Sequence, residues 1–150
     1  KEIGDTTMQI LKEPGLYAGY RRTEAGVAPT LRRINAGESI EEEAKAQLSR
    51  LAKTFPLEDI VILSSNKKLL ENLVGTLKVE TASIEAPKKG RVRWGTAQAF
   101  KGMEAAAILL VEFEDGASSR ETFYISSTRS LAELACVMPA KVIEKLVKGI

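Results

Sequence analysis

The chain has 150 residues, of which 44% are hydrophobic and 28% are charged, and its formal net charge is +2. This size and composition fit one soluble globular domain over 1–150. No apolar run approaches the roughly 20 residues of a membrane-spanning helix. A net charge this small does not by itself argue for nucleic acid as a partner. The sequence begins without a methionine, and we expect it to be a fragment of a longer protein.

The chain contains one cysteine and no histidine. A Ser-His-Asp triad is therefore excluded, and these counts argue against a zinc site. Cys136 lies in the apolar run LACVM without a histidine to act as its base, so we expect a buried structural thiol. A single cysteine cannot form an internal disulfide, which suits a reducing compartment, and we expect a cytoplasmic protein.

The apolar pattern predicts helices that alternate with short strands. The opening KEIGDTTMQIL is typical of an amphipathic helix over 1–12 rather than of a signal peptide. A strand is expected over 30–36, and the clearest helical spacing follows over 39–55. Further strands are expected at 59–65, 91–96, 107–113 and 135–138, a β-leaning segment at 78–86, and helices after Asn66, over 120–134 and over 140–147.

Two of these helices have recognisable first residues. Ser39 with Glu42 forms a capping-box pattern, and Asn66 can cap the next helix. The strand expected between them, DIVILSS, is a continuous apolar run, which is typical of a strand buried on both faces. Together with the alternation of elements, this run predicts an α/β fold with a parallel sheet covered by helices on both faces.

The polar loop TAQAFKGME separates two predicted strands. Ligands of open parallel sheets bind at the carboxyl ends of the strands, where we expect this loop to lie. Gly102 can take a positive φ or let a ligand approach the backbone, Glu104 could accept from a sugar hydroxyl, and Lys101 could meet a phosphate. Thr96 and Gln98 are neutral donors suited to phosphate oxygens. Taken alone, such a loop is more often a solvated connection with a turn glycine.

A second candidate is Arg129, in the segment FYISSTRSLAEL. It follows a Ser-Ser-Thr run near the expected end of a helix. Its guanidinium could stabilise the charge on a phosphoryl group, as arginine fingers do. Taken alone, it would more often be a surface arginine in a salt bridge.

The chain lacks a phosphate-binding loop of the Gly-x-x-x-x-Gly-Lys-Ser/Thr type. Glu112, Glu114 and Asp115 lie at the end of a predicted strand, before a glycine turn, and we expect them to be solvated rather than to hold magnesium. This chain therefore cannot assemble a nucleotide hydrolysis site by itself.

The order TAQAFKGME, strand, FYISSTRS, strand resembles the C-terminal motor domain of UvrD/Rep-like superfamily 1 helicases. In that family the first motif reads roughly Thr-x-His-x-x-Lys-Gly-Leu-Glu, and the second reads Leu-Tyr-Val-Ala-x-Thr-Arg-Ala. The run IVILSSN is similar to the family's earlier strand, which ends in Arg-Ser-Asn, and the opening KEI is similar to the residues that follow its Tyr-Arg motif. The resemblance covers nearly the whole chain.

This resemblance implies a RecA-like fold, related to the P-loop NTPases, with three layers. It also implies a role as one half of an ATP-dependent DNA helicase, with ATP and Mg as cofactors. Gly102 and Glu104 would meet the nucleotide, with Glu104 on the ribose, and Arg129 would be the catalytic arginine finger at the γ-phosphate. The phosphate loop and the magnesium ligands would come from the N-terminal motor domain of the same protein.

On the same resemblance, Thr96, Gln98 and Lys101 belong to the surface that contacts single-stranded or partly duplex DNA. Three departures bear on it: Gln98 stands where histidine is usual, Ser130 replaces an alanine, and Ser64 replaces an arginine. The family's large accessory insertion would fall between the helix after Asn66 and 91, where this chain has only a short connection.

Two other functions remain open at this stage. One is a catalytically inactive helicase-like domain that binds nucleic acid or a partner protein. The other is an unrelated doubly wound domain that binds a small nucleotide or phosphorylated ligand through the Gly102 loop. A position of Arg129 far from that loop would favour the second.

Overall fold

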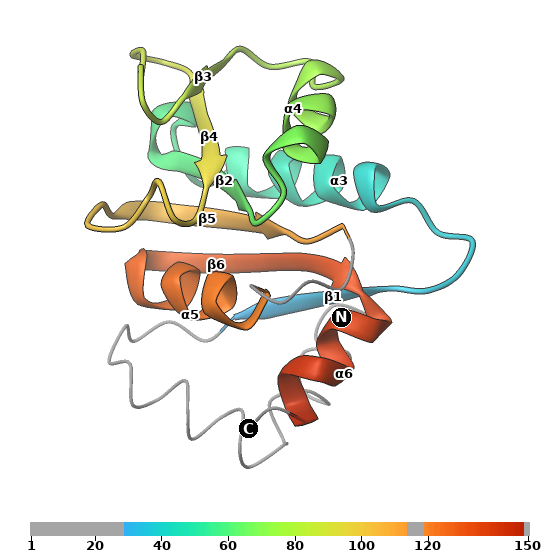
Figure 1. Ribbon diagram of the computed structural model, residues 1–150. Coiled ribbons are helices and arrows are strands. Elements are labelled where there is room, and N and C mark those ends of the chain that lie inside the picture. The colour runs from blue at the N-terminus through green and yellow to red at the C-terminus, as the bar shows by residue number, and fades with distance from the viewer. Residues whose placement is uncertain (1–28, 114–118, 149–150) are drawn as a thin grey trace.

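The computed structural model describes residues 29–113 and 119–148 (Figure 1). The helix predicted over 1–12 lies outside these residues, as do Glu114 and Asp115. Within the described ranges, no helix is both long and apolar enough to cross a membrane.

The described part of the chain forms one sheet of six strands, and all of its strand pairs are parallel. The order across the sheet is β1-β6-β5-β2-β4-β3. The strands are β1 Thr30–Ile34, β2 Ile60–Ser64, β3 Thr81–Ser83, β4 Val92–Thr96, β5 Ala105–Val111 and β6 Ser130–Pro139. Every residue of β2 is buried, as its continuous apolar run predicted.

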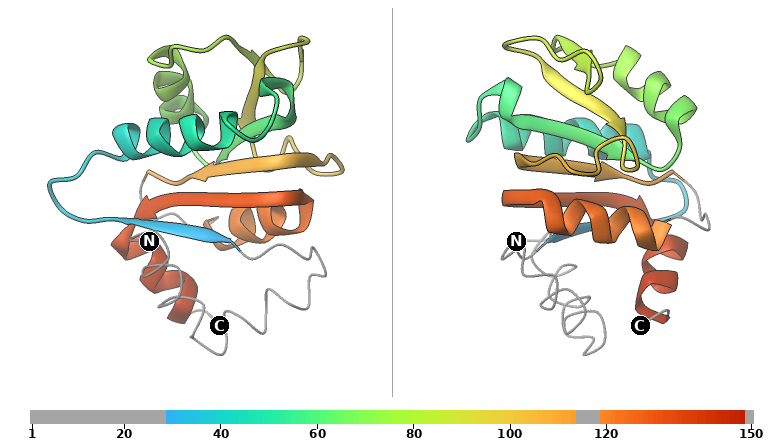
Figure 2. Two further views of the ribbon diagram at one scale, coloured as in Figure 1. Left: turned by 180° about the vertical axis from the view of Figure 1, so that it is seen from behind. Right: turned by 60° about the vertical axis from the view of Figure 1, so that its left-hand side comes forward.

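Helices cover both faces of the sheet, so the fold has three layers (Figures 1 and 2). The helices are α3 Ile40–Ala52, α4 Lys67–Gly75, α5 Ser119–Arg129 and α6 Ala140–Lys148, and a short 3-10 helix, η1, spans Leu57–Asp59. One face packs against α3 and α4 and the other against α5 and α6.

The two cores divide the residues of each central strand by alternation. In β2, Ile60 and Ile62 pack on the side of α3 and α4, whereas Val61 and Leu63 pack on the side of α5 and α6. Because both faces of the central strands are apolar and buried, we expect residues that bind ligands to lie at the ends of these strands.

Both predicted helix caps are confirmed. The Ser39 hydroxyl accepts a hydrogen bond from the Glu42 amide at 3.1 Å, and the Asn66 side chain accepts one from the Leu69 amide at 3.0 Å. These bonds satisfy amides that the first helical turn leaves without partners.

The prediction was wrong at the junction of α5 and β6. A helix was expected over 120–134, but α5 ends at Arg129 and β6 begins at Ser130. Leu131, Ala132 and Glu133 are good helix formers, but here they extend a strand that pairs with β5 and β1 on its two sides. Pairing in the sheet therefore overrides local helix propensity. As a result, Arg129 ends α5 directly before the first residue of a central strand.

Candidate functional site

The amino ends of β5 and β6 bring Glu104 and Arg129 together. Glu104 immediately precedes β5, and Arg129 immediately precedes β6. The residues that follow them, Ala105 and Ser130, are paired across these two neighbouring strands. Since adjacent strands lie about 5 Å apart, Glu104 and Arg129 emerge next to each other at the same edge of the sheet.

Gly102 turns the chain just before this edge. Its φ is +86°, in the left-handed region that was predicted for it and that favours glycine. A Cβ added at Gly102 would have no atom within 4 Å, so the backbone conformation, not packing, calls for glycine here. The space above this turn is open to a ligand.

Hydroxyl groups fix the end of α5 that presents Arg129. Ser127 Oγ donates to the Tyr124 carbonyl at 2.9 Å, and Thr128 Oγ1 donates to the Ile125 carbonyl at 3.0 Å. Ser130 Oγ donates to the Ser126 carbonyl at 2.7 Å. Ser127 and Thr128 thus bond back onto their own helix through their hydroxyls, and the last turn leads directly into the strand.

The Arg129 guanidinium forms no ion pair with a carboxylate in the described part of the chain. The side chain is half-buried, and no hydrogen bond or ion pair joins it to another described residue. Its Nε is buried and lacks a hydrogen-bond partner there. Arg129 therefore does not form the salt bridge that is common for surface arginines, at least with any described residue. A buried guanidinium nitrogen without a partner is costly, and an anion would satisfy it.

Lys101, in contrast, is engaged. Its Nζ lies 3.4 Å from a carboxylate oxygen of Glu121 on α5, and both side chains are about half exposed. This exposed ion pair links the loop to the helix and adds little stability. The Lys101 amide donates to the Gln98 carbonyl at 3.3 Å. Within the described residues, the Lys101 ammonium forms no ion pair with Thr96 or Gln98, although the resemblance groups the three.

Thr96 and Gln98 lie at the opposite end of the strands. Thr96 is the last residue of β4, at the carboxyl end of the sheet. The chain then runs back across the sheet to the amino end of β5 (Figure 2). The expectation that the whole loop lies at carboxyl ends is therefore wrong for Gly102 and Glu104, because two parallel strands can be joined only by a connection that returns along the sheet.

A small hollow of about 20 Å³ adjoins Thr96, and Lys67, Ser83 and Ala99 also line it. Thr96 Oγ1 accepts a hydrogen bond from the Ala99 amide at 3.2 Å, which orders the turn that follows β4. Gln98, within this turn, is exposed. These residues offer neutral donors and one lysine at the carboxyl end of β4.

Glu112 was predicted to be solvated, and this prediction was wrong. The side chain is 1% exposed and accepts two hydrogen bonds from Ser65, from the amide at 3.1 Å and from the hydroxyl at 2.6 Å. Burial raises the pKa of Glu112 to about 7, although the two hydrogen bonds from Ser65 act in the opposite direction. The signal in the sequence was its position directly after the buried strand β5, between Val111 and Phe113.

The Glu112–Ser65 pair joins the carboxyl ends of β5 and β2, which are neighbours in the sheet. The chain leaves β2 toward α4 on one face and leaves β5 toward α5 on the other.

Cys136 on β6 is fully buried, as predicted. Burial, assisted by the charge of Glu112, raises the pKa of the Cys136 thiol, so it does not act as a nucleophile at neutral pH.

Comparisons with known proteins give a structural match. No protein-family model matches the chain, and no curated protein does. The fold is similar to that of the C-terminal domain of a possible DNA helicase from Lactobacillus plantarum WCFS1, with a TM-score of 0.57 and 16% sequence identity. The match covers 80% of this chain and 78% of the other. The predicted RecA-like α/β fold is thereby confirmed.

Proposed function

We propose that this chain is the C-terminal motor domain of an ATP-dependent superfamily 1 DNA helicase of the UvrD/Rep type. The observation that carries the proposal is the register of β5 with β6, which places Glu104 and Arg129 at neighbouring positions at the amino edge of the sheet. A structural neighbour that is itself described as a possible helicase domain supports it. The rival in which Arg129 lies far from the Gly102 loop is not supported by this arrangement.

On this proposal, the amino edge of the sheet is half of an ATP site. Gly102 lets the nucleotide approach the backbone closely, Glu104 accepts hydrogen bonds from the ribose hydroxyls, and Arg129 donates to the γ-phosphate oxygens. A guanidinium without a competing carboxylate suits this role, since its fork of donors matches phosphate oxygens and stabilises their developing charge.

The other half of the site would come from a second motor domain. Two large apolar side chains are exposed near these residues: Met103 directly precedes Glu104, and Leu131 lies two residues after Arg129. Exposed apolar side chains beside a half-complete polar site fit a surface that another domain covers. On the resemblance, the ligands of the Mg that accompanies ATP would also come from that domain.

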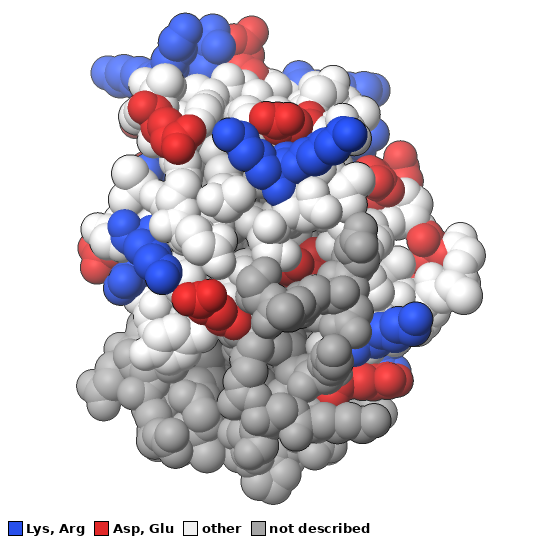
Figure 3. Space-filling view, viewed as in Figure 1, with Lys and Arg blue, Asp and Glu red and all other residues white. Residues whose placement is uncertain are grey.

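The carboxyl end of β4 would contact single-stranded DNA. Thr96, Gln98 and Lys67 lie at or near this end and can donate to phosphate oxygens, which positions a strand without reading its sequence. Basic and acidic side chains alternate on the face seen in Figure 3. On this proposal, a few individual hydrogen-bond donors would therefore contact the DNA phosphates, rather than a broad basic patch. Lys101 could join it by leaving Glu121, since their ion pair is exposed.

Glu104→Ala in the full-length protein tests the nucleotide half of the proposal. We expect ATP to bind about tenfold more weakly, because a hydrogen bond to a charged acceptor contributes about 1.5–3 kcal/mol. The measurement is the Kd for a fluorescent ATP analogue. Glu144→Ala, a change of an exposed carboxylate on α6, is the control. An ATP affinity that stays the same in Glu104→Ala would count against the ribose contact.

Gln98→Glu tests the DNA half. A negative charge at this exposed position should weaken binding of a single-stranded oligonucleotide by about tenfold at low salt, by repulsion of the phosphates. Fluorescence anisotropy at two salt concentrations measures it. Gln98→Ala should have a smaller effect, and an equal loss in both variants would point to a disturbed turn instead.

A further inference from the structure

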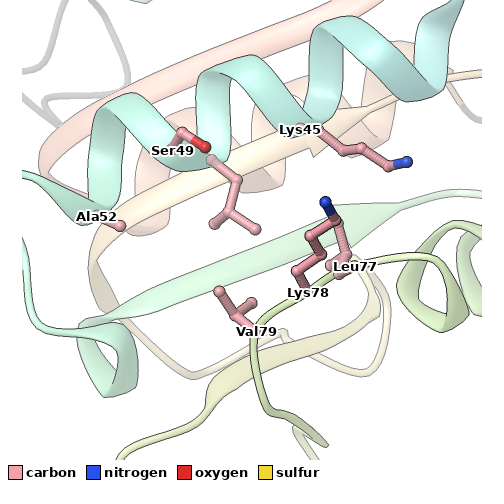
Figure 4. A pocket seen from close by; sticks show the side chains of 7 residues that line it. Lys45, Ser49, Ala52, Leu77, Lys78 and Val79 are labelled. Carbon is pink, nitrogen blue, oxygen red and sulfur yellow. The ribbon is translucent and has the colours of Figure 1, made fainter.

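A hollow on the α3 and α4 side of the sheet has no role in the site proposed above. It has a volume of about 300 Å³ and lies between α3 and the segment 77–79 that leads toward β3 (Figure 4). Its apolar lining includes Leu48 and Ala52 from α3 and Leu77 and Val79 from that segment. A volume of this size is at the lower end of the range for ligand pockets.

Two lysines stand over this apolar lining. Lys45 extends along α3 at the edge of the hollow and Lys78 points toward α3 from the facing segment, and Figure 4 shows both ammonium groups on the same side of the hollow. Lys45 is 3.7 Å from Glu42, a neighbour that is itself mostly exposed. Lys78 has no ion pair with any described residue. The two ammonium groups therefore make this side of the hollow suitable for a ligand with negative charge.

The wall that carries Lys78 also offers free backbone groups. The segment 77–80 belongs to no helix or strand, and neither Lys78 nor Val79 makes a backbone hydrogen bond to a described residue. An extended chain can bind such a segment through its own amides and carbonyls, with one side chain in the neighbouring pocket. A small anion would leave these backbone groups unused.

We propose that this hollow is a docking site for an acidic, extended segment of a partner protein, which inserts one large apolar side chain between Leu48 and Val79. The apolar anchor fills the hollow, while carboxylates next to the anchor meet Lys45 and Lys78. Anchors of this kind supply most of the binding energy in protein interfaces, and charges at the rim select the partner and speed association.

The test uses three fluorescein-labelled peptides, EEDLDEE, EEDFDEE and EEDWDEE, in anisotropy titrations with this chain. We expect at least one of them to bind, and the matched peptide EEDSDEE to bind at least about tenfold more weakly because it lacks the anchor. Absence of binding by all three peptides, or equal binding by the serine peptide, would overturn the proposal.

Two variants locate the binding. Lys78→Glu should weaken binding about tenfold by charge reversal, whereas Lys141→Glu, which makes the same change on α6 at the other face, should leave it unchanged. Ala52→Phe keeps both lysines and fills the hollow from an exposed helix position, and it should also abolish binding. Circular dichroism melts show that each variant is folded. Equal losses in Lys78→Glu and Lys141→Glu would show unspecific attraction and would contradict the site.

Discussion

Arg129→Ala in the full-length protein should lower the rate of ATP hydrolysis about a thousandfold or more, the effect typical of an arginine finger. Arg129 immediately precedes β6, at the same edge of the sheet as Glu104, and its side chain has no ion pair with a described carboxylate. On the proposed function, its contribution belongs to the transition state, when charge develops on the transferred phosphoryl group. We therefore expect kcat to fall while DNA affinity stays close to that of the unchanged protein.

Two further variants sharpen this experiment. Arg129→Lys keeps the charge but loses the planar fork of donors, so it should recover only a small part of the activity. Arg91→Ala is the matched control, because this arginine already pairs with Glu80 at 2.9 Å and precedes β4, which β2 separates from β5. Normal turnover in Arg129→Ala would sink the proposed function, whereas equal losses in both alanine variants would point to a general disturbance of the fold.

The rate measurement also separates the proposed function from its first rival. An inactive helicase-like binding module would hold DNA but show no hydrolysis that Arg129 could support. A full-length protein that binds single-stranded DNA and hydrolyses no ATP, with or without Arg129, would favour that rival. The peptide experiment on the α3 side does not depend on this outcome, since it uses neither nucleotide nor DNA.

The strands and helix starts of this fold could be predicted because their signals are local. A continuous apolar run indicated β2, and a side chain at each cap indicated α3 and α4. The residues 130–134 gave the opposite signal, since they favour a helix but form the start of β6. What decides their conformation is the pair of neighbouring strands, and these are far away in sequence.

The candidate site could be predicted in its members but not in its geometry. Motif order singled out Gly102, Glu104 and Arg129, yet only the register of β5 with β6 shows that Glu104 and Arg129 adjoin. The same strand arrangement separates Thr96 from Glu104, although one short loop contains both. Glu112 was missed because a glutamate before a glycine turn looks solvated, and its partner Ser65 lies 47 residues away.

Glu112 should make the stability of the chain depend on pH in an unusual direction. Its pKa is raised from 4.5 to about 7 in the folded protein, so between these values the folded state keeps a proton that the unfolded state has released. The free energy of unfolding must then fall as pH rises through this range and level off above about 7. The total fall should be about 3.5 kcal/mol, since the pKa rises by about 2.5 and one pKa unit corresponds to about 1.4 kcal/mol.

Urea denaturation at pH 5.5 and pH 8 measures this dependence, and the absence of histidine leaves few other side chains that titrate between these values. Glu112→Gln keeps an oxygen that can accept from the Ser65 amide but cannot ionise, so the variant should lose most of the pH dependence. Between pH 5.5 and pH 8, its free energy of unfolding should therefore fall less than that of the unchanged chain. Glu144→Gln, an exposed carboxylate on α6, should leave the slope as it is. If Glu112→Gln retained the full slope, the buried carboxyl would not be its source, and another group would have to take up the proton on folding.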